Sequence, residues 1–418
     1  MTGVGGESRL ATDQVSAAKA ASYVVFFTAG FLMMSWASRI PQVRDGLGLD
    51  PAQLGLLLLS SSVGSLASLT FAGAVIDRVG SRRAVIIFTL LGTTGMASAG
   101  VGYLVGAPVV ALGLTLSGLG IGGWDVAMNV QGSLVEQHLG RAILPRFHAG
   151  YSIGTVFGSL VGVGMIALHV PVTLHLVAAS GVVLIANLAA VRSFLSTPTR
   201  YAIGDGLENN IDAAASAPAK NREASRAHYS ILDAWREPRI ILIGLFVLII
   251  AFAEGSAVDW VGLGLIDGYG SPATVGTLGL ATFLTAMTLA RWFGTNLLDR
   301  FGRVPVLSVL SAFLVAGTAL FIFGPNTATA FLGALLWGVG ASLGFPVGMS
   351  AAGDDPKKAA ARVSAVATIG YAAFLGGPPL IGFLANHWGV LHGLIAVLIA
   401  APFSFLLVRA LKQEQPGT

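Results

Sequence analysis

The sequence lacks cysteine and is poor in charge. None of its 418 residues is cysteine, so neither a disulfide bond nor a thiolate metal site can form. Charged residues make up 11% of the chain, whereas soluble domains carry about 25%. Hydrophobic residues make up 54%, a balance that is typical of a protein that lies in a lipid bilayer.

The absence of two kinds of motif excludes some classes of function. The chain has no Gly-x-x-x-x-Gly-Lys-Ser/Thr sequence, so we expect no ATP-driven step within it. It also has no His, Asp or Glu spacing that is typical of a metal site and no nucleophile elbow. These absences argue against an enzyme and predict no metal and no cofactor. The net charge of +4 would suggest acidic partners for a soluble protein, but here we expect no nucleic-acid partner.

Apolar runs between polar or Gly/Pro breaks predict twelve transmembrane helices. The runs cover residues 20–42, 52–75, 83–104, 108–137, 146–168, 172–192, 239–266, 273–297, 304–323, 327–352, 362–384 and 388–411. Residues 193–238 form the only long polar segment, which we interpret as a mobile linker with a short surface helix near Ile231–Trp235. The prediction is an all-α membrane protein with a six-helix bundle in residues 1–192 and another in 239–418.

Basic residues lie almost entirely on one side of the predicted spans. An even number of spans puts both termini on the same side, together with the linker and nearly all loop arginines and lysines. The opposite side carries only Arg39 and Arg44. By the positive-inside rule, we predict that the termini and the linker are cytoplasmic. The first apolar run has no small-residue cleavage site after it, so we interpret it as a retained span.

One charged sequence occurs twice. The first copy, between the second and third runs, is Gly73-Ala-Val-Ile-Asp77-Arg78-Val-Gly80-Ser81-Arg82-Arg83. The second copy, Asp299-Arg300-Phe-Gly302-Arg303, lies at the corresponding place in the second half, where Thr295 replaces the first glycine. Duplicated halves are typical of carriers that move one half against the other. We therefore predict two pseudo-symmetric bundles in which both copies act in gating, the complete copy being the main latch.

Glycine and proline predict two features of packing. Gly150, Gly154, Gly158 and Gly162 recur at every fourth position of the fifth helix, so a neighbouring helix can approach closely. In the eleventh helix, the sequence Gly376-Gly377-Pro378-Pro379 predicts an interrupted backbone, because proline has no N–H to donate.

Ionisable side chains inside the predicted spans are candidates for function, because burying them is costly. Asp125, Asn129 and Glu136 share one face of the fourth helix, and Glu254 lies deep in the seventh, five residues before Asp259. A proton-coupled carrier requires a protonatable group there, so Asp125, Glu254 and Glu136 are proton-coupling candidates. The alternative is that an arginine or backbone donors hold each carboxylate and only lock helices together. We favour this alternative for Glu136 and Asp259.

The fifth helix carries a polar stripe of His148, Tyr151, Ser152 and Thr155, which would line a hydrated path. His148 titrates near neutral pH and is a further proton-coupling candidate, although such a histidine is more often structural.

Aromatic residues complete the predicted solute site. Trp36 and Arg39 share a face near the end of the first helix, where they would stack on a sugar ring or attract an anion, or else anchor the helix at the interface. Trp124, Trp260 and Tyr371 are further candidates, with bundle filling as the alternative. The substrate-binding candidates are therefore Trp36, Arg39, Trp124, Asn129, Tyr151, Ser152, Thr155, Asp259, Trp260 and Tyr371.

The duplicated hinge and the twelve-span layout together resemble the major facilitator superfamily over essentially the whole chain. Asp125-x-x-x-Asn129 with His148-Ala-Gly-Tyr151-Ser152-x-Gly154 resembles the fucose-permease-like branch, with a weaker similarity to permeases linked to inositol-derived rhizopines. The resemblance implies that the hinge aspartate pairs with helix ends and basic residues to hold the outward-open state. It also implies that the acidic residue of the fourth helix, here Asp125, belongs to the proton and sugar site.

A secondary transporter accounts for the duplication, the paired hinges and the carboxylates within spans better than a channel or an enzyme does. We predict a monomeric, proton-coupled carrier that moves a small polar, sugar- or polyol-like solute across the bacterial inner membrane. Its partners are the solute, protons and the bilayer. Proton-driven export of amphipathic drugs or metabolites is the alternative.

Overall fold

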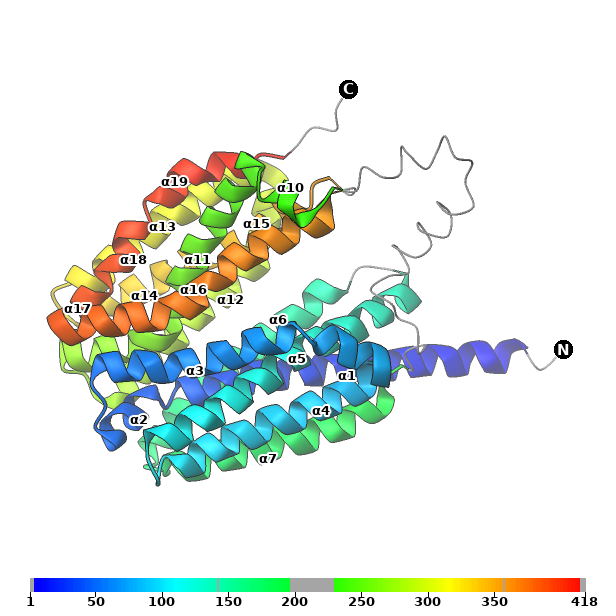
Figure 1. The fold of residues 1–418 in the computed structure, drawn as a ribbon, viewed down its shortest axis with the longest axis horizontal. Coiled ribbons are helices and arrows are strands. Elements are labelled where there is room, and N and C mark those ends of the chain that lie inside the picture. Colours follow the sequence, from blue (N-terminus) through cyan, green and yellow to red (C-terminus); the bar gives the residue numbers. More distant parts are fainter. Residues whose placement is uncertain (1–3, 141–142, 196–228, 356–357, 414–418) are drawn as a thin grey trace. The chain divides into compact units, whose positions relative to one another are not determined.

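The protein is almost entirely helical. The structure is a computed structural model that describes residues 4–140, 143–195, 229–355 and 358–413, and every regular element within these residues is a helix (Figure 1). Twelve helical segments are long and apolar enough to cross a bilayer. The predicted all-α fold with twelve spans is therefore confirmed.

The spans of the N-terminal half follow one another with short connections. They are α1 (Val4–Ala37) with α2 (Ile40–Leu47), α3 (Pro51–Leu69), α4 (Ala72–Gly102), α5 (Ala107–Leu139), α6 (Leu144–Ala167), and α7 (Val172–Ala190) with η1 (Val191–Ser193). Pro41 lies in the first turn of α2. Proline is well tolerated there because an amide in the first turn has no helical partner to lose.

The C-terminal half contains more helix breaks. Its spans are α11 (Pro238–Leu263) with η2 (Gly264–Gly268), α12 (Ala273–Phe301), α13 (Arg303–Phe323), α14 (Thr327–Ala341) with α15 (Gly344–Ala352), α16 (Ala359–Trp388), and a last span of α17 (Val390–Gly393), α18 (Ile395–Ala400), α19 (Phe403–Leu407) and η3 (Val408–Leu411). The short helix expected near the end of the linker is present as α10 (Ile231–Ala234), which Ser230 caps. Residues 196–228 of the linker lie outside the described residues.

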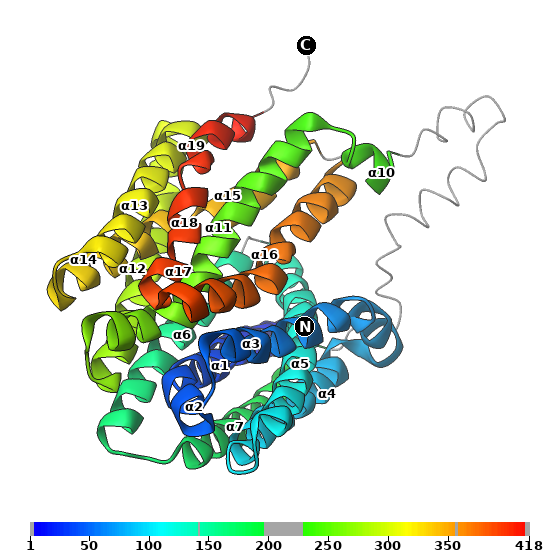
Figure 2. The ribbon, with the colours of Figure 1, turned by 60° about the vertical axis from the view of Figure 1, so that its left-hand side comes forward.

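By their contacts, the helices group into two compact units. The first holds Met1–Trp36, Ser60–Gly158 and Val170–His228, and within it α4 packs along α5 and α7. The second holds Ala37–Leu59, Ser159–His169 and Tyr229–Thr418. Within it α11 packs along α16 and α13 along α14 (Figure 2). The division at the linker, into residues 1–192 and 239–418, stays a prediction.

The charged hinge lies at a kink between two helical pieces of α4. We expected a gap between residues 75 and 83, but α3 already ends at Leu69 and α4 begins at Ala72, so Asp77 and Arg78 lie within α4. Only Gly80 leaves the helical conformation, with φ 79° and ψ 158°. This glycine separates the two helical pieces, and a further turn precedes it at Thr70, where the hydroxyl donates to the carbonyl of Ala67 at 2.7 Å.

The two halves repeat the same helix crossings. In each half, two glycines bring the third and fourth spans so close that an added Cβ would meet the backbone of the facing helix. The pairs are Gly95 with Ser117 and Gly113 with Ala99 in the first half, and Gly317 with Trp337 and Gly333 with Phe321 in the second. Because the glycines fall at equivalent positions, the repeat extends beyond the hinge into the packing of the bundles.

The glycine stripe of α6 packs as predicted. An added Cβ on Gly154 would meet the backbone of Phe27 in α1, and one on Gly158 would lie 2.7 Å from the carbonyl oxygen of Phe31. The four-residue step along α6 thus matches a four-residue step along α1, and the predicted close approach is confirmed.

The predicted interruption of the eleventh span is wrong. The backbone of α16 stays helical from Ala359 to Trp388, through Pro378 and Pro379. The flanking segment instead forms a close crossing with α3, since an added Cβ on Gly55 would lie 2.5 Å from the carbonyl oxygen of Pro378. The helical path therefore continues through two residues that have no amide hydrogen to donate.

Candidate functional site

Asp125, Asn129 and His148 form a chain of hydrogen bonds on the first unit. The side-chain amide of Asn129 donates to the backbone oxygen of Asp125 at 2.9 Å and to its carboxylate at 3.4 Å. The amide oxygen of Asn129 lies 3.0 Å from Nε2 of His148. An amide oxygen only accepts, so Nε2 carries the hydrogen in this arrangement. Asp125 and His148 are both exposed, so the two titratable groups at the ends of this series of hydrogen bonds are accessible.

Helix geometry and aromatic packing place these three groups. Asp125 and Asn129 are one turn apart on α5, as the sequence indicated. His148 lies near the start of α6, where its ring meets Phe26 of α1 edge to face at 5.1 Å. Phe147 stacks on the same phenylalanine at 5.6 Å. The aromatic contacts therefore fix the start of α6 so that His148 reaches α5.

The predicted polar stripe of α6 divides into an accessible and a buried part. Tyr151 is half-buried and donates its hydroxyl to the sulfur of Met33 at 3.1 Å. Ser152 and Thr155 are 7% and 4% exposed, and the hydroxyl of Thr155 donates to the carbonyl of Ser152 at 2.7 Å. Because α1 crosses α6 at Gly30, Ser152 and Thr155 are covered in this structure, and their role in solute binding stays a prediction.

Glu136 caps a helix. Its carboxylate accepts the backbone amides of Ile143 and Leu144 at 2.6 and 2.8 Å, at the first residues of α6. These amides have no partner within the helix, and a negative charge also suits the helix N-terminus. Glu136 is thus held by backbone donors and ties the end of α5 to the start of α6.

Glu254 is paired with an arginine. The guanidinium of Arg291 on α12 donates to the carboxylate of Glu254 at 2.9 Å and, through Nε, to the carbonyl oxygen of Ser342 at 2.7 Å. Ser342 lies at the break between α14 and α15. The apolar run at residues 327–352 predicted one continuous span, without this break. The available signal was Pro346, four residues after Ser342.

The predicted tryptophan contacts are buried. Trp124 and Trp260 have no exposed surface, so their rings fill the protein interior and cannot stack on a solute in this structure. Trp36 and Arg39 are 8% and 2% exposed, and the predicted platform at the end of α1 is therefore also covered. Helix packing encloses these four side chains, and their predicted role in solute binding stays a prediction.

Tyr371 and Asp259 are more accessible. Both are half-buried, and Tyr371 packs near the rings of Phe345 and Phe374. In the described part of the chain, Asp259 makes no hydrogen bond and no ion pair. A carboxylate without a partner remains available to a solute or a proton.

The two hinge copies differ in their contacts. In the complete copy Asp77, Arg78, Arg82 and Arg83 are exposed and form no ion pair with any described residue. Gly73 and Gly80 belong to the same helix, α4.

The incomplete copy is the one that forms ion pairs. Arg303 donates to both carboxylate oxygens of Asp354, at 2.8 and 2.9 Å, and Arg239 donates to the same carboxylate at 3.1 Å. Asp299 and Arg300 are exposed beside Gly302. That the complete copy is the main latch stays a prediction.

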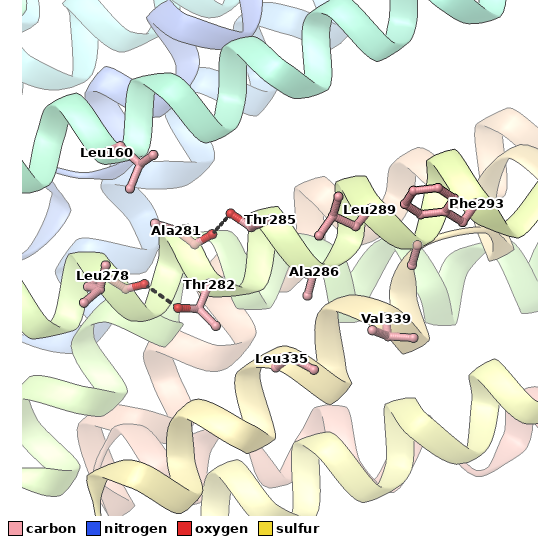
Figure 3. A pocket seen from close by; sticks show the side chains of 11 residues that line it. Leu160, Leu278, Ala281, Thr282, Thr285, Ala286, Leu289, Phe293, Leu335 and Val339 are labelled. Atoms are coloured by element: carbon pink, nitrogen blue, oxygen red, sulfur yellow. Dashed lines mark hydrogen bonds between the residues drawn. The ribbon is translucent and has the colours of Figure 1, made fainter.

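An apolar groove of about 460 Å³ lies among α6, α12 and α14 of the second unit (Figure 3). The hydroxyls of Thr282 and Thr285 donate to carbonyl oxygens of their own helix, at Leu278 and Ala281. None of the lining residues is charged, and the remaining side chains are hydrophobic. The groove therefore fits an apolar group rather than a sugar.

Comparison with known proteins establishes the family. The family profile of the Major Facilitator Superfamily matches residues 21–263, more than half of the chain. The chain belongs to this superfamily. An uncharacterised transporter of the superfamily from Yersinia pestis is 29% identical over 90% of this chain and 91% of its own length. The membrane protein MosC of Rhizobium meliloti is 26% identical over 89% of this chain and 85% of its own.

Solved structures of the superfamily share the fold. The nucleoside transporter NupG aligns with a TM-score of 0.69 at 16% identity, over 94% of this chain and 98% of that one. The E. coli fucose–proton symporter FucP aligns with a TM-score of 0.62 at 15% identity, over 94% and 98%. The predicted superfamily is thus confirmed, and the protein is a multi-pass membrane transporter rather than an enzyme.

Proposed function

We propose that this transporter is a proton-coupled carrier of a small polar, sugar- or polyol-like solute. It works by alternating access across a bacterial cytoplasmic membrane, with both termini and the linker on the cytoplasmic side. The observation that carries the proposal is the hydrogen-bonded chain Asp125–Asn129–His148. It joins two titratable groups to an amide that can both donate to and accept from a hydroxylated solute. FucP and NupG, whose fold is shared, move fucose and nucleosides, which carry hydroxyl groups.

Asp125 is the coupling group in this proposal. A charged carboxylate within a span is stable only where it faces water or a partner. Protonation removes its charge before the site closes to one side of the membrane and opens to the other. Asn129 does not itself carry a proton. Its side chain bonds to both Asp125 and His148, so protonation of either one changes the donors and acceptors that a solute meets.

The other carboxylates rank behind Asp125. Arg291 already neutralises Glu254, and backbone amides hold Glu136. We propose Asn129 and Tyr151 for solute contact on the first unit. On the second unit we propose Asp259, which has no partner among the described residues.

We also propose that both hinge copies act at the cytoplasmic gate. The unpaired charges of Asp77, Arg78, Arg82 and Arg83 are available for new partners when the gate closes. Arg303 and Asp354 hold the second copy in one arrangement, so its contribution is to keep the start of α13 fixed.

The test uses the purified protein in liposomes that contain a pH indicator. Sugars, polyols, amino acids and common drugs are added in turn, and proton movement is followed. We expect Asp125→Asn to insert and fold but to lose solute-driven proton movement, while Asp13→Asn, on an exposed carboxylate at the start of α1, keeps it. If Asp125→Asn still accumulates solute on a proton gradient as the unchanged protein does, coupling through Asp125 is wrong.

Export of an amphipathic compound is the second candidate. The apolar groove lined by Leu278, Leu289 and Leu335 favours it, because such a surface binds alkyl chains. The same liposome assay separates the two, since antiport moves protons in the direction opposite to the solute. A response to amphipathic drugs in that direction, with none to sugars or polyols, would favour export.

A further inference from the structure

The tenth span is broken because of one proline. In a continuous helix the amide of residue 346 would donate to the carbonyl of Ser342, four residues earlier. Pro346 has no amide hydrogen, so this carbonyl lacks its helical donor. The helix accordingly stops at Ala341 and restarts at Gly344, with Ser342 and Leu343 between α14 and α15.

Arg291 supplies the missing donor. Its Nε lies 2.7 Å from the carbonyl oxygen of Ser342, the atom that the amide of residue 346 would otherwise reach. A terminal nitrogen of the same guanidinium donates to Glu254 at 2.9 Å. One planar group therefore joins α11 and α12 to the break in the tenth span, and its charge is balanced by a carboxylate.

The other contacts around the break do not fix the angle between α14 and α15, which leaves the bond from Arg291 to set it. The hydroxyl of Ser342 donates to the carbonyl of Val339 at 2.7 Å, so it serves the end of α14 and not the start of α15. On the other side, Gly344 packs against Ile250 of α11, where an added Cβ would lie 2.6 Å away. A glycine contact makes no directional bond. The bond from Arg291 is the directional one that α12 makes to the break.

We propose that Arg291 is a positioning residue that replaces the amide removed by Pro346 and fixes the angle between α14 and α15. Glu254 orients the guanidinium for this task. The tenth span then behaves as two rigid pieces whose joint is controlled from α11 and α12. The proposal rests on the carrier function only for its effect on transport, since the joint itself can be measured without any solute.

A suppressor experiment tests this assignment. Arg291→Met removes the donor, and Pro346→Ala returns an amide to position 346, which makes the arginine unnecessary. The chain has no cysteine, so two cysteines introduced at Leu332 of α14 and Met349 of α15 can carry spin labels without background. We expect Arg291→Met to broaden the distance distribution between the labels, and Arg291→Met with Pro346→Ala to return it to the width found with Pro346→Ala alone.

Two matched variants serve as controls. Pro379→Ala also removes a proline from a helix interior, but it lies in α16 and should not rescue Arg291→Met. Arg409→Met removes an exposed arginine of the same unit and should leave the distribution unchanged.

Transport provides a second readout once a solute is known. Leaving the buried carbonyl of Ser342 unpaired should shift the equilibrium between arrangements of the joint roughly tenfold. We therefore expect Arg291→Met to slow transport by about that factor and the double variant to recover most of the lost rate. An unchanged distribution in Arg291→Met, or a double variant as broad as the single one, would overturn the assignment. If the distances between the spin labels behave as expected but the protein moves none of the tested solutes, the proposed function is wrong and the assignment of Arg291 still stands.

Discussion

Gly80 and Gly302 adopt the same left-handed backbone conformation, although they belong to different halves of the chain. Gly80 has φ 79° and ψ 158°, and Gly302 has φ 80° and ψ 169°. Each is the glycine of an Asp-Arg-x-Gly sequence, and each lets the chain change direction with no non-helical residue besides the glycine. The duplicated sequence is therefore duplicated in its backbone geometry as well.

This geometry predicts the cost of a side chain at either position. Positive φ combined with an extended ψ is a conformation that essentially only glycine adopts, and another residue there costs about 1–3 kcal/mol, so Gly80→Ala and Gly302→Ala should each lower the melting temperature in detergent. Gly181→Ala is the control, because Gly181 is helical, nothing lies within 4 Å of its added Cβ, and alanine favours helices. Equal melting temperatures for Gly80→Ala and Gly181→Ala would contradict the prediction.

Asn129 connects the two titratable ends of the proposed site, and its removal should uncouple them. Asn129→Leu deletes the bonds to Asp125 and His148 while keeping similar volume, and we expect an initial rate of proton-coupled uptake about tenfold lower. Adding Asp125→Asn should cause little further loss, because residues of one network are not additive. Asn296→Leu, at an exposed asparagine of α12, is the control. Fully additive losses would show that the residues act separately.

Contacts within one helix were predictable, and contacts between helices mostly were not. Asp125 and Asn129 follow from a spacing of four residues, and the glycine stripe of α6 follows from a period of four. His148 reaches Asn129 from another helix, and only the aromatic packing on Phe26 sets that approach. Trp124 is fully buried, and its burial depends on how α5 is rotated about its axis against its neighbours, which the sequence of one helix does not reveal.

Proline explains the two errors in helix continuity. Pro378 suggested a break where α16 stays helical, whereas Pro346 lies at a break that we did not predict. The difference lies in the partners. A carbonyl without its helical donor is stable in either case only if another group satisfies it, and Arg291 is distant in sequence from Ser342.

A buried polar triad should stabilise the first unit. The hydroxyl of Thr28 donates to the amide oxygen of Asn187 at 2.7 Å, and the amide nitrogen donates to Thr89 at 3.2 Å, so one side chain joins α1, α4 and α7. Asn187→Leu leaves buried partners unpaired and should reduce the free energy of unfolding by about 1–3 kcal/mol. Ser180→Ala is the control on α7, because that hydroxyl bonds only its own helix. Equal stability losses in the two variants would exclude a special role for the triad.

Glu237, which precedes α11, should make the stability of the second unit sensitive to acid. Its carboxylate pairs with Arg362 at 2.8 Å and with Lys358 at 3.5 Å. Partial burial acts against the charge, but contacts with Tyr229, Arg362 and Lys358 outweigh it and lower the pKa of Glu237 below the ordinary 4.5. A lowered pKa means that the ion pairs stabilise the fold above the ordinary value and that this contribution disappears as the pH falls through the lowered one.

The corresponding measurement is the melting temperature between about pH 7 and pH 3. Glu237→Gln should melt lower than the unchanged protein at neutral pH, and the two curves should converge as the pH approaches the lowered pKa, because the variant has no carboxylate left to protonate there. Asp13→Asn, at an exposed carboxylate with no ion pair among the described residues, should follow the unchanged protein throughout. Parallel curves for Glu237→Gln and the unchanged protein would mean that the acid sensitivity arises from other carboxylates.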